Sequence, residues 1–286
     1  MPEPEMKHTR GNDRCNAESA AVKPEPAQLA GTWFNTDPGT SEISKVILSV
    51  RDGVVAMRAF GANGTAPIDW GEVPATPYVD RIGSSLVTGF LAHYDFGFMQ
   101  TQLATNVKYG VLVIQSYNRF ADESGRPPYF TREFFSKEVA HNPAPLPAEA
   151  ACATRADLPI QSGTSVGAVD LAHYVGHWTN TNPETLAITH FDFTKRGERF
   201  YVRASGSGYP GDWGEAEVTP HAYDVSSPRG LAFIARYVFD FAEITLAGNE
   251  NKGLIIIASY HRFKDASSRS NYFKREFFYR QEAVRR

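Results

Sequence analysis

Hydrophobic and polar residues alternate along most of this chain, and a period of two is the pattern of a half-buried β-strand. In the first half, the strand-like runs are residues 43–50, 54–60, 86–98, 99–105, 111–120 and 129–137. In the second half, they are residues 187–193, 199–204, 231–241, 244–247, 254–263 and 272–280. No stretch of about ten residues inside either half has helical periodicity. The chain is therefore predicted to be all-β.

Residues that favour tight turns separate these runs. They are Asp52-Gly53, Asn63-Gly64, Gly248-Asn249 and the Ser-, Gly- and Pro-containing loop after Asp122. Together with a short opening strand that contains a Gly-x-Trp motif, the pattern predicts about seven or eight strands in each half.

The two halves repeat one another in sequence. Residues 110–135 (GVLVIQSYNRFADESGRPPYFTREFF) align without a gap with residues 253–278 (GLIIIASYHRFKDASSRSNYFKREFF), and 15 of the 26 positions are identical. Residues 31–40 match residues 176–185, and both halves contain an Asp-Trp-Gly-Glu motif. Similarity of this length indicates a tandem duplication of one module.

Composition divides the chain into four segments. Residues 1–27 are charged and contain several prolines, which predicts a disordered tail. Residues 139–170 are rich in Ala, Pro, Ser and Gly, which is typical of a linker. The two modules would then span residues 28–138 and 171–286.

Many short strands joined by short loops favour a closed, up-and-down antiparallel β-barrel in each module, because closure leaves no exposed sheet edge. A β-sandwich is the alternative. The modules open on Gly31-x-Trp33 and Gly176-x-Trp178. In this opening strand, and in the succession of short strands that follows it, each module resembles the lipocalin and avidin (calycin-like) barrels. The resemblance implies a barrel whose mouth admits a small ligand, and it assigns no binding residue.

Composition and charge narrow the possible partners. Of the 286 residues, 42% are hydrophobic and 13% aromatic, which suffices for packed cores. The net charge of −3 gives no electrostatic reason to expect a nucleic-acid or membrane partner. The N-terminus lacks the apolar segment of a secretory signal, and Cys15 and Cys152 lie in the predicted tail and linker. We therefore expect reduced cysteines and a cytoplasmic protein.

Several kinds of chemistry lack their sequence motifs. There is no phosphate-binding loop, dinucleotide-binding glycine motif, serine-hydrolase elbow, zinc-peptidase motif or Cys-x-x-Cys pair. The 8 histidines have no metal-ligand spacing. We therefore expect neither a cofactor nor a metal, and any enzymatic activity would have to be cofactor-independent.

Residues that both modules share are interpreted as scaffold. Trp33 and Trp178 are expected to close one end of each barrel by packing on the last strand, and Asn35 and Asn180 to open Asx turns. The Asp-Trp-Gly-Glu motifs hold paired carboxylates, which suits acid–base chemistry. Their glycine, however, favours a bend in which the Asp caps the backbone.

A Tyr-x-Arg pair near the end of each module is also shared. Tyr117 and Arg119 lie on one face of their strand, and Tyr129 and Glu133 share a face of the next. If Arg119 and Glu133 meet across this hairpin, they would form an ion pair. Because the second module repeats these residues, a scaffold role is favoured.

Positions at which the modules differ are the better guide to function. His93 and Asp95 are replaced by Arg236 and Val238 in the second module. Inside a barrel they would form a proton-transfer dyad, and on the outside an ordinary solvated pair. The candidate catalytic residues are His93, Asp95 and Tyr117. The candidate ligand-binding residues are Tyr94, Gln100, Gln102, Arg119, Tyr237, Asp240, Glu243 and Tyr260.

The preferred prediction is a protein that binds a small apolar or aromatic molecule in one barrel or between the two. The alternative is a cofactor-independent cyclase, isomerase or lyase, in which a Tyr, a His or a carboxylate moves one proton. A third possibility is a tandem module that only makes protein interactions. A pocket with perturbed ionisable groups would favour catalysis, a pocket without them binding, and filled barrels the third possibility.

Overall fold

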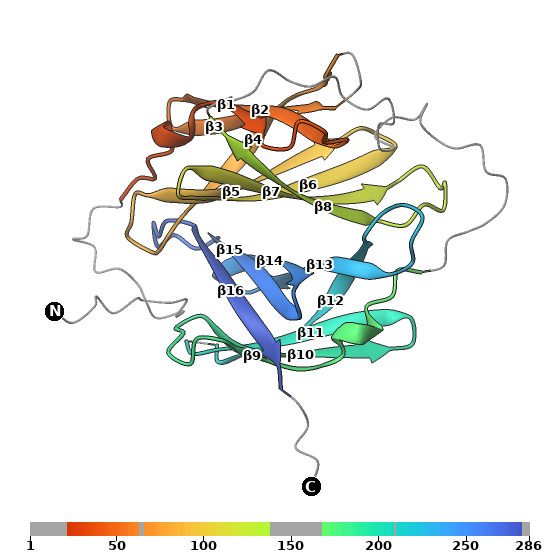
Figure 1. Cartoon of the computed structure of the whole chain (residues 1–286). Helices are drawn as coiled ribbons and strands as arrows, with labels where there is room; N and C mark the ends of the chain where they lie inside the picture. Colours follow the sequence, from red (N-terminus) through yellow and green to blue (C-terminus); the bar gives the residue numbers. More distant parts are fainter. Residues whose placement is uncertain (1–21, 63–65, 138–167, 209, 282–286) are drawn as a thin grey trace, which may run out of the picture.

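The computed structural model describes residues 22–62, 66–137, 168–208 and 210–281. Sixteen strands pair into one sheet with ring-like bonding, and this part of the chain contains no α-helix (Figure 1). Two short 3-10 helices, η1 (Ala27–Leu29) and η3 (Ala172–Tyr174), each precede the first strand of a half. The prediction of an all-β chain is confirmed.

The first eight strands pair in sequence order, and the first also pairs with the last through Asn35 and Phe135. We call this group the first ring. Its strands are β1 (Gly31–Asn35), β2 (Ile43–Arg51), β3 (Val54–Gly61), β4 (Ile68–Val79), β5 (Val87–Asp95), β6 (Met99–Lys108), β7 (Val111–Phe120) and β8 (Tyr129–Ser136).

The other eight strands form the second ring in the same way, and β9 pairs with β16 through Asn180 and Phe278. Its strands are β9 (Gly176–Asn180), β10 (Ile188–Arg196), β11 (Arg199–Gly206), β12 (Asp212–Ala222), β13 (Gly230–Val238), β14 (Ala242–Asn251), β15 (Leu254–Phe263) and β16 (Tyr272–Arg280).

Two single-residue parallel pairings join the rings, which lie one above the other in Figure 1. Ala222 of β12 pairs with Tyr129 of β8, and Tyr272 of β16 pairs with Val79 of β4. These links make the two rings one continuous hydrogen-bonded sheet.

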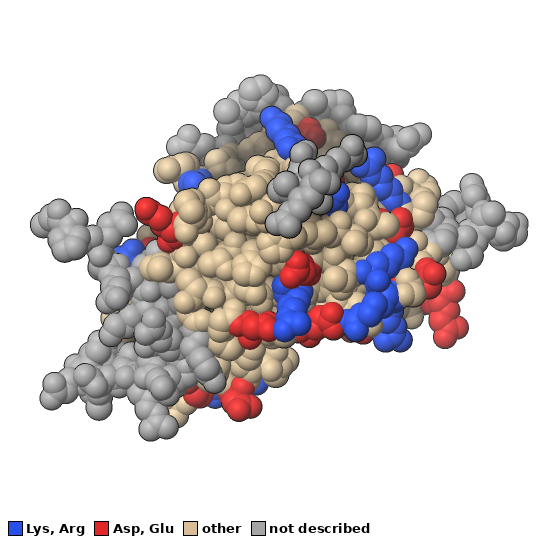
Figure 2. All heavy atoms as spheres, turned by 90° about the horizontal axis from the view of Figure 1, so that it is seen from below, with Lys and Arg blue, Asp and Glu red and all other residues tan. Residues whose placement is uncertain are grey.

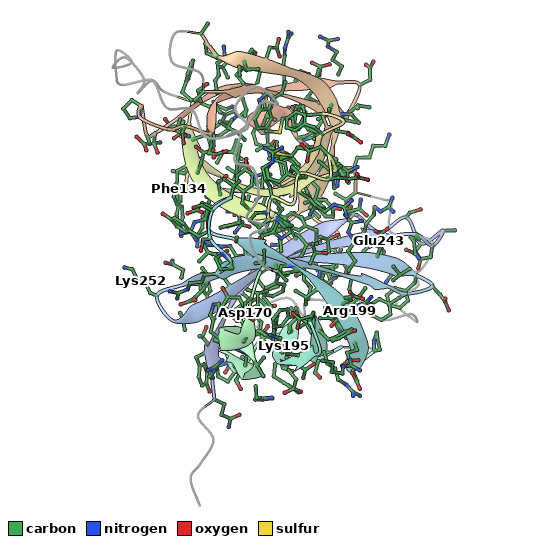
Figure 3. All side chains as sticks on the ribbon, turned by 90° about the vertical axis from the view of Figure 1, so that its right-hand side faces the viewer. Phe134, Asp170, Lys195, Arg199, Glu243 and Lys252 are labelled. Atoms are coloured by element: carbon green, nitrogen blue, oxygen red, sulfur yellow. The ribbon has the colours of Figure 1, made fainter. Side chains whose placement is uncertain are left out.

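The described ends of the predicted tail and linker also pair with the rings. Glu25 forms an isolated bridge with Leu86, and Asp170 forms one with Arg229. Asp170 also pairs with Lys195, at 3.2 Å (Figure 3). The rest of both segments, including Cys15 and Cys152, lies outside the described residues, so the prediction of reduced cysteines stays a prediction.

Buried side chains fill the interior of each ring and also pack between the rings (Figure 3). The core of the first ring includes Trp33, Met57 and Phe90, and the core of the second includes Trp178 and Phe233. A third cluster takes residues from both rings. Its members are Tyr78, Leu91, Ala104, Tyr117, Phe130, Ala232, Ile234, Ala247, Ala258, Tyr260 and Phe273.

The shared tryptophans are buried where each ring closes. Trp33 is 3% exposed, and its indole N–H donates to the carbonyl of Leu29 at 2.9 Å. Lys137, just beyond β8, lies 5.1 Å from the Trp33 ring. Trp178 has the same surroundings in the second ring, where Arg280 of the last strand lies 5.2 Å from its ring. The first and last strands therefore meet over a buried indole.

The alternation of hydrophobic and polar residues did not predict two of the strands. The pattern missed β4 and β12, which contain the Asp-Trp-Gly-Glu motifs. Gly71 and Gly214 have positive φ there, and each strand has an irregular register beside its motif, which breaks the alternation.

The predicted turn at Gly248 and Asn249 is instead part of strand β14. A Cβ on Gly248 would come within 2.2 Å of the Phe233 ring, so this glycine allows close packing.

The Asp-Trp-Gly-Glu motifs are bends held by ion pairs. Asp69 accepts a hydrogen bond from the amide of Gly71 at 2.9 Å and pairs with Arg58. Asp212 does the same with Gly214 and Arg203. Both pairs are exposed. Figure 2 shows acidic and basic side chains next to one another on one face of the molecule. The predicted backbone cap is confirmed.

Glu133 does not meet Arg119 across the hairpin, so the condition for an ion pair between them is not met. Glu133 lies opposite Ile114 in the β7–β8 ladder, several residues from Arg119 along β7. Its carboxylate instead accepts hydrogen bonds from the side chains of Asn35 and Thr40 and from the amide of Ile43. Glu133 therefore fastens the Asx turn between β1 and β2, and Glu276 does the same in the second ring.

Two neighbouring acidic side chains at the turn between β1 and β2 predict a dependence of stability on pH. Burial raises the pKa of Glu133 to about 7, and burial together with Glu133 raises the pKa of neighbouring Glu42 to about 8. Both pKa values lie above the ordinary 4.5 of an unfolded chain. Their stabilising contribution is therefore complete below about pH 4.5 and lost as the pH rises through about 7 to 8.

We expect the free energy of unfolding, measured by urea denaturation, to fall across this range. Glu42→Gln should reduce that fall, because it removes one of the two titrating carboxyls. Glu184→Gln, on the exposed surface, is the matched control. A pH profile of Glu42→Gln identical to that of the wild type would contradict this prediction.

Candidate functional site

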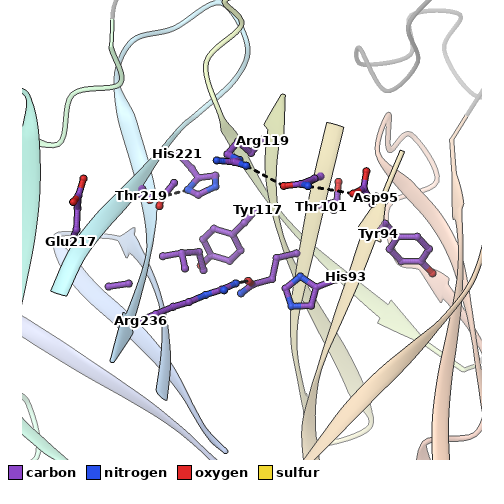
Figure 4. Close-up of a pocket in the computed structure, with 14 residues that line it drawn as sticks. His93, Tyr94, Asp95, Thr101, Tyr117, Arg119, Glu217, Thr219, His221 and Arg236 are labelled. Carbon is purple, nitrogen blue, oxygen red and sulfur yellow. Dashed lines mark hydrogen bonds between the residues drawn. The ribbon is translucent and has the colours of Figure 1, made fainter. Parts of the chain in front are cut away.

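A cleft of about 640 Å³ lies between the two rings (Figure 4). We call it the inter-ring cleft. Strands β5, β6 and β7 of the first ring contribute His93, Asp95, Gln100, Gln102, Tyr117 and Arg119. Strands β12 and β13 of the second ring contribute Glu217, Thr219, His221, Ile234 and Arg236. The cleft exists only because the rings pack together, since neither contributes all of its walls.

His93 and Asp95 both line this cleft, from alternate positions of β5. Asp95 accepts hydrogen bonds from the amide of Gly97 at 2.8 Å and from Gln100 at 3.3 Å, so it is bonded to its own hairpin rather than to His93. His93 is exposed at the mouth of the cleft, and partial desolvation there together with the charge of Arg236 lowers its pKa. His93 is therefore largely uncharged at neutral pH.

Tyr117 and His221 form the buried wall of the cleft. Their exposed fractions are 2% and 3%, and their ring centroids lie 5.1 Å apart with the planes nearly perpendicular. Burial raises the pKa of Tyr117 and lowers the pKa of His221 to about 4. His221 Nδ1 donates to the carbonyl of Thr219 at 3.1 Å. Both side chains are therefore uncharged at neutral pH, and the tyrosine keeps its proton.

Two arginines reach the cleft, and each donates to a glutamine amide. Arg236 Nη2 lies 3.0 Å from Gln102 Oε1, and Arg119 Nη2 lies 3.1 Å from Gln100 Oε1. The first of these bonds crosses between the rings, and Figure 4 shows Arg236 reaching from the second ring toward the first. The two carboxylates of the cleft, Asp95 and Glu217, have other partners, because Glu217 pairs with Arg199 at 3.4 Å.

Three of the predicted site residues do not offer their polar groups to the cleft. The Tyr94 hydroxyl turns into the first ring, where it donates to the carbonyl of Met57 at 2.9 Å. The Tyr237 hydroxyl donates to the carbonyl of Val202 inside the second ring. Asp240 is exposed in the turn after β13. The other predicted site residues line either the inter-ring cleft or a second pocket.

A smaller pocket of about 220 Å³ is built from equivalent positions with the roles of the rings exchanged. We call it the second pocket. The residues that align with Gln100, Gln102, Tyr117, Arg119, Thr219, His221 and Ile234 are Glu243, Thr245, Tyr260, Arg262, Thr76, Tyr78 and Leu91. His93 and Arg236, which align with one another, border both spaces. The interface thus has approximate two-fold symmetry.

Sequence reasoning missed the contribution of β12, and with it His221. This strand was not predicted, so the comparison of the halves stopped at its Asp-Trp-Gly-Glu motif and did not reach His221. The signal was present in the aligned sequences, because Tyr78 of the first half corresponds to His221 of the second. A tyrosine in one copy and a histidine in the other is a change in chemistry at a buried position.

Comparison with known proteins adds no family to this description. No family model matches the chain, and no curated protein shows significant similarity to it. Among the described residues, no group of three or more His, Cys, Asp or Glu side chains could hold a metal ion. No helix in the same residues is long and apolar enough to span a membrane.

Proposed function

We propose that this chain consists of two up-and-down barrels and binds a small organic molecule in the inter-ring cleft. The observation that carries the proposal is the cleft itself, which is walled by both rings and large enough for a small ligand. Three of its polar residues, His93, Gln100 and Gln102, occupy positions at which the two halves differ. Shared residues suffice for the scaffold, so divergence at the cleft supports a function there.

The pairing pattern supports the barrel part of this proposal. Each ring closes between its first and last strands, beside a buried tryptophan of a Gly-x-Trp motif. This arrangement is what the resemblance to lipocalin- and avidin-like barrels implies. The interiors of the rings, however, are packed with aromatic and aliphatic side chains. The proposed ligand site is therefore between the rings.

The polar lining changes the expected ligand. An apolar or aromatic molecule was expected from the sequence, but most side chains in the cleft are polar, and two are arginines. A ligand that fits would place an aromatic or aliphatic body against Ile234 and Tyr117 and polar groups toward the arginines and glutamines.

A proton-transfer enzyme is the second candidate, favoured by the state of three side chains. His93 is largely uncharged and can accept a proton, as a general base must. Tyr117, buried against His221, keeps its proton and can donate a hydrogen bond to a developing negative charge. Incubating the protein and its ligand in D₂O distinguishes the candidates, because only an enzyme of this kind would exchange a carbon-bound proton of the ligand.

The test of binding is native mass spectrometry of the purified protein, with the mass of any retained small molecule as the readout. We expect His93→Ala and Asp95→Asn to lose that molecule while the free energy of unfolding changes by less than about 1 kcal/mol. Both side chains are exposed, so little folding energy depends on them. His177→Ala, in β9 and outside the cleft, is the matched control.

Two results would contradict the binding proposal. One is full retention of the molecule by both cleft variants. The other is wild-type protein that carries no molecule and gains no thermal stability from any compound in a chemically diverse panel. Either result would favour the hypothesis of a tandem module that only makes protein interactions. The packed interiors of the rings also favour that hypothesis.

A further inference from the structure

Two hydrogen-bond donors at the inter-ring cleft lack acceptors. The Tyr117 hydroxyl and Gln102 Nε2 are both buried, and neither makes a hydrogen bond to any residue that the structure describes. Burying a polar group without a partner lowers the stability of the folded state, so most buried polar groups in proteins are hydrogen-bonded. Two of them on the wall of one cleft therefore call for an acceptor from outside the chain.

The second pocket shows that the scaffold does not require these unpaired donors. Tyr260, which aligns with Tyr117, donates its hydroxyl proton to the carbonyl of Thr105 at 2.8 Å. Gln102 aligns with Thr245, which has no amide N–H to satisfy. Among the described residues, no side chain that lines only the second pocket has a buried donor without a partner, whereas the inter-ring cleft has two such donors.

The partners of the arginines also differ between the second pocket and the inter-ring cleft. In the second pocket, Arg262 pairs with the carboxylate of Glu243 at 2.5 Å. In the inter-ring cleft, the aligned Arg119 meets the neutral amide of Gln100, and Arg236 meets the neutral amide of Gln102. Among the described residues, neither of these two guanidinium groups forms a salt bridge with a carboxylate. At the position of Glu243, the inter-ring cleft therefore has a neutral amide, and its two carboxylates, Asp95 and Glu217, pair with neither of these arginines.

We propose that the inter-ring cleft takes a ligand with a carboxylate group, which accepts hydrogen bonds from Tyr117 and Gln102 and pairs with Arg236. A carboxylate supplies acceptor lone pairs without a donor of its own, and a guanidinium binds it with two parallel hydrogen bonds. Arg236 is exposed, so it can release Gln102 and turn to the ligand at little cost. This inference rests on the proposed ligand-binding function and specifies its ligand class.

Benzoate and benzamide are suitable probes because they share shape and differ in charge. Binding to the full chain would be measured by isothermal titration calorimetry at low salt. We expect benzoate to bind at least about tenfold more tightly than benzamide, a difference of about 1.4 kcal/mol. Raising the salt concentration should weaken benzoate binding more than benzamide binding.

Matched substitutions test whether benzoate binds in the inter-ring cleft. Arg236→Gln should weaken benzoate binding about tenfold or more, whereas Arg262→Gln, which removes the paired arginine of the second pocket, should leave it unchanged. Tyr117→Phe should weaken benzoate binding without lowering the melting temperature of the free protein, because the lost hydroxyl has no partner. Tyr260→Phe should lower the melting temperature, because it removes the buried hydrogen bond to the Thr105 carbonyl.

Three outcomes would overturn the inference. They are equal affinity for the two probes, equal loss of benzoate binding in Arg236→Gln and Arg262→Gln, and a lower melting temperature for Tyr117→Phe than for Tyr260→Phe. A neutral molecule found in the wild-type protein, together with no benzoate binding, would overturn the carboxylate assignment and leave the proposed binding function intact. An empty protein that binds no probe of any kind would contradict both.

Discussion

Replacing Trp33 or Trp178 with alanine is expected to lower the free energy of unfolding by about 3–5 kcal/mol. Both indoles are at least 95% buried, and each hydrogen-bonds a backbone carbonyl of the segment before its strand. The substitution would leave a large cavity where the first and last strands of a ring meet, and would leave that carbonyl without its donor. Urea denaturation followed by circular dichroism measures the loss.

Tyr109→Ala is the control for these tryptophans. Tyr109 is an aromatic residue in the β6–β7 hairpin and is 93% exposed, so its removal should change the free energy of unfolding by no more than about 0.5 kcal/mol. Losses below about 1 kcal/mol for both tryptophan variants would mean that the indoles do not hold the rings closed.

Gly248→Ala is expected to cost about 1–3 kcal/mol, which is large for the addition of one methyl group. The new Cβ would lie 2.2 Å from Cζ of Phe233, far inside van der Waals contact. The Phe233 ring is fully buried and packs 5.4 Å from the Phe193 ring, so it has little room to move away. The cost therefore comes from overpacking.

A double-mutant cycle tests that cause. Phe233→Leu shortens the opposing side chain, so Gly248→Ala should be less damaging in that background than in the wild type. Gly211→Ala, where the nearest atom is 3.8 Å from the new Cβ, should change stability little. Equal costs for Gly248→Ala in both backgrounds would show that the methyl group does not clash with Phe233.

Local sequence patterns predicted most of the strands because strands such as β2, β3, β10 and β11 bury mainly one face, and β15 is a continuous apolar run. Residues 111–120, 254–263 and 272–280 were predicted with the bounds that the structure has. The pattern failed where pairing was irregular, as in β4 and β12, and where glycine served packing rather than a turn, as at Gly248. In both cases the cause lies in a neighbouring strand, which a local pattern does not contain.

Candidate site residues were predicted in part. Divergence between the two halves pointed to His93, Gln100 and Gln102, which line the inter-ring cleft. Alternation along β5 and β13 could not show that Tyr94 and Tyr237 face the ring interiors, because the inner face of a strand is known only when the ring is closed. The partnership of Tyr117 with His221 joins strands that are about a hundred residues apart and belong to different halves.

The sequence by itself determined that the chain is all-β, that its two halves repeat one another, and which positions the repeat left free to diverge. The order of residues is enough to show these properties. A strand that buries one face needs alternating hydrophobic and polar residues, and duplication copies that alternation into the second half. The tertiary structure alone decided where the divergent residues meet. The inter-ring cleft exists because two rings pack with approximate two-fold symmetry, and packing between distant surfaces depends on shape and burial that no local pattern records.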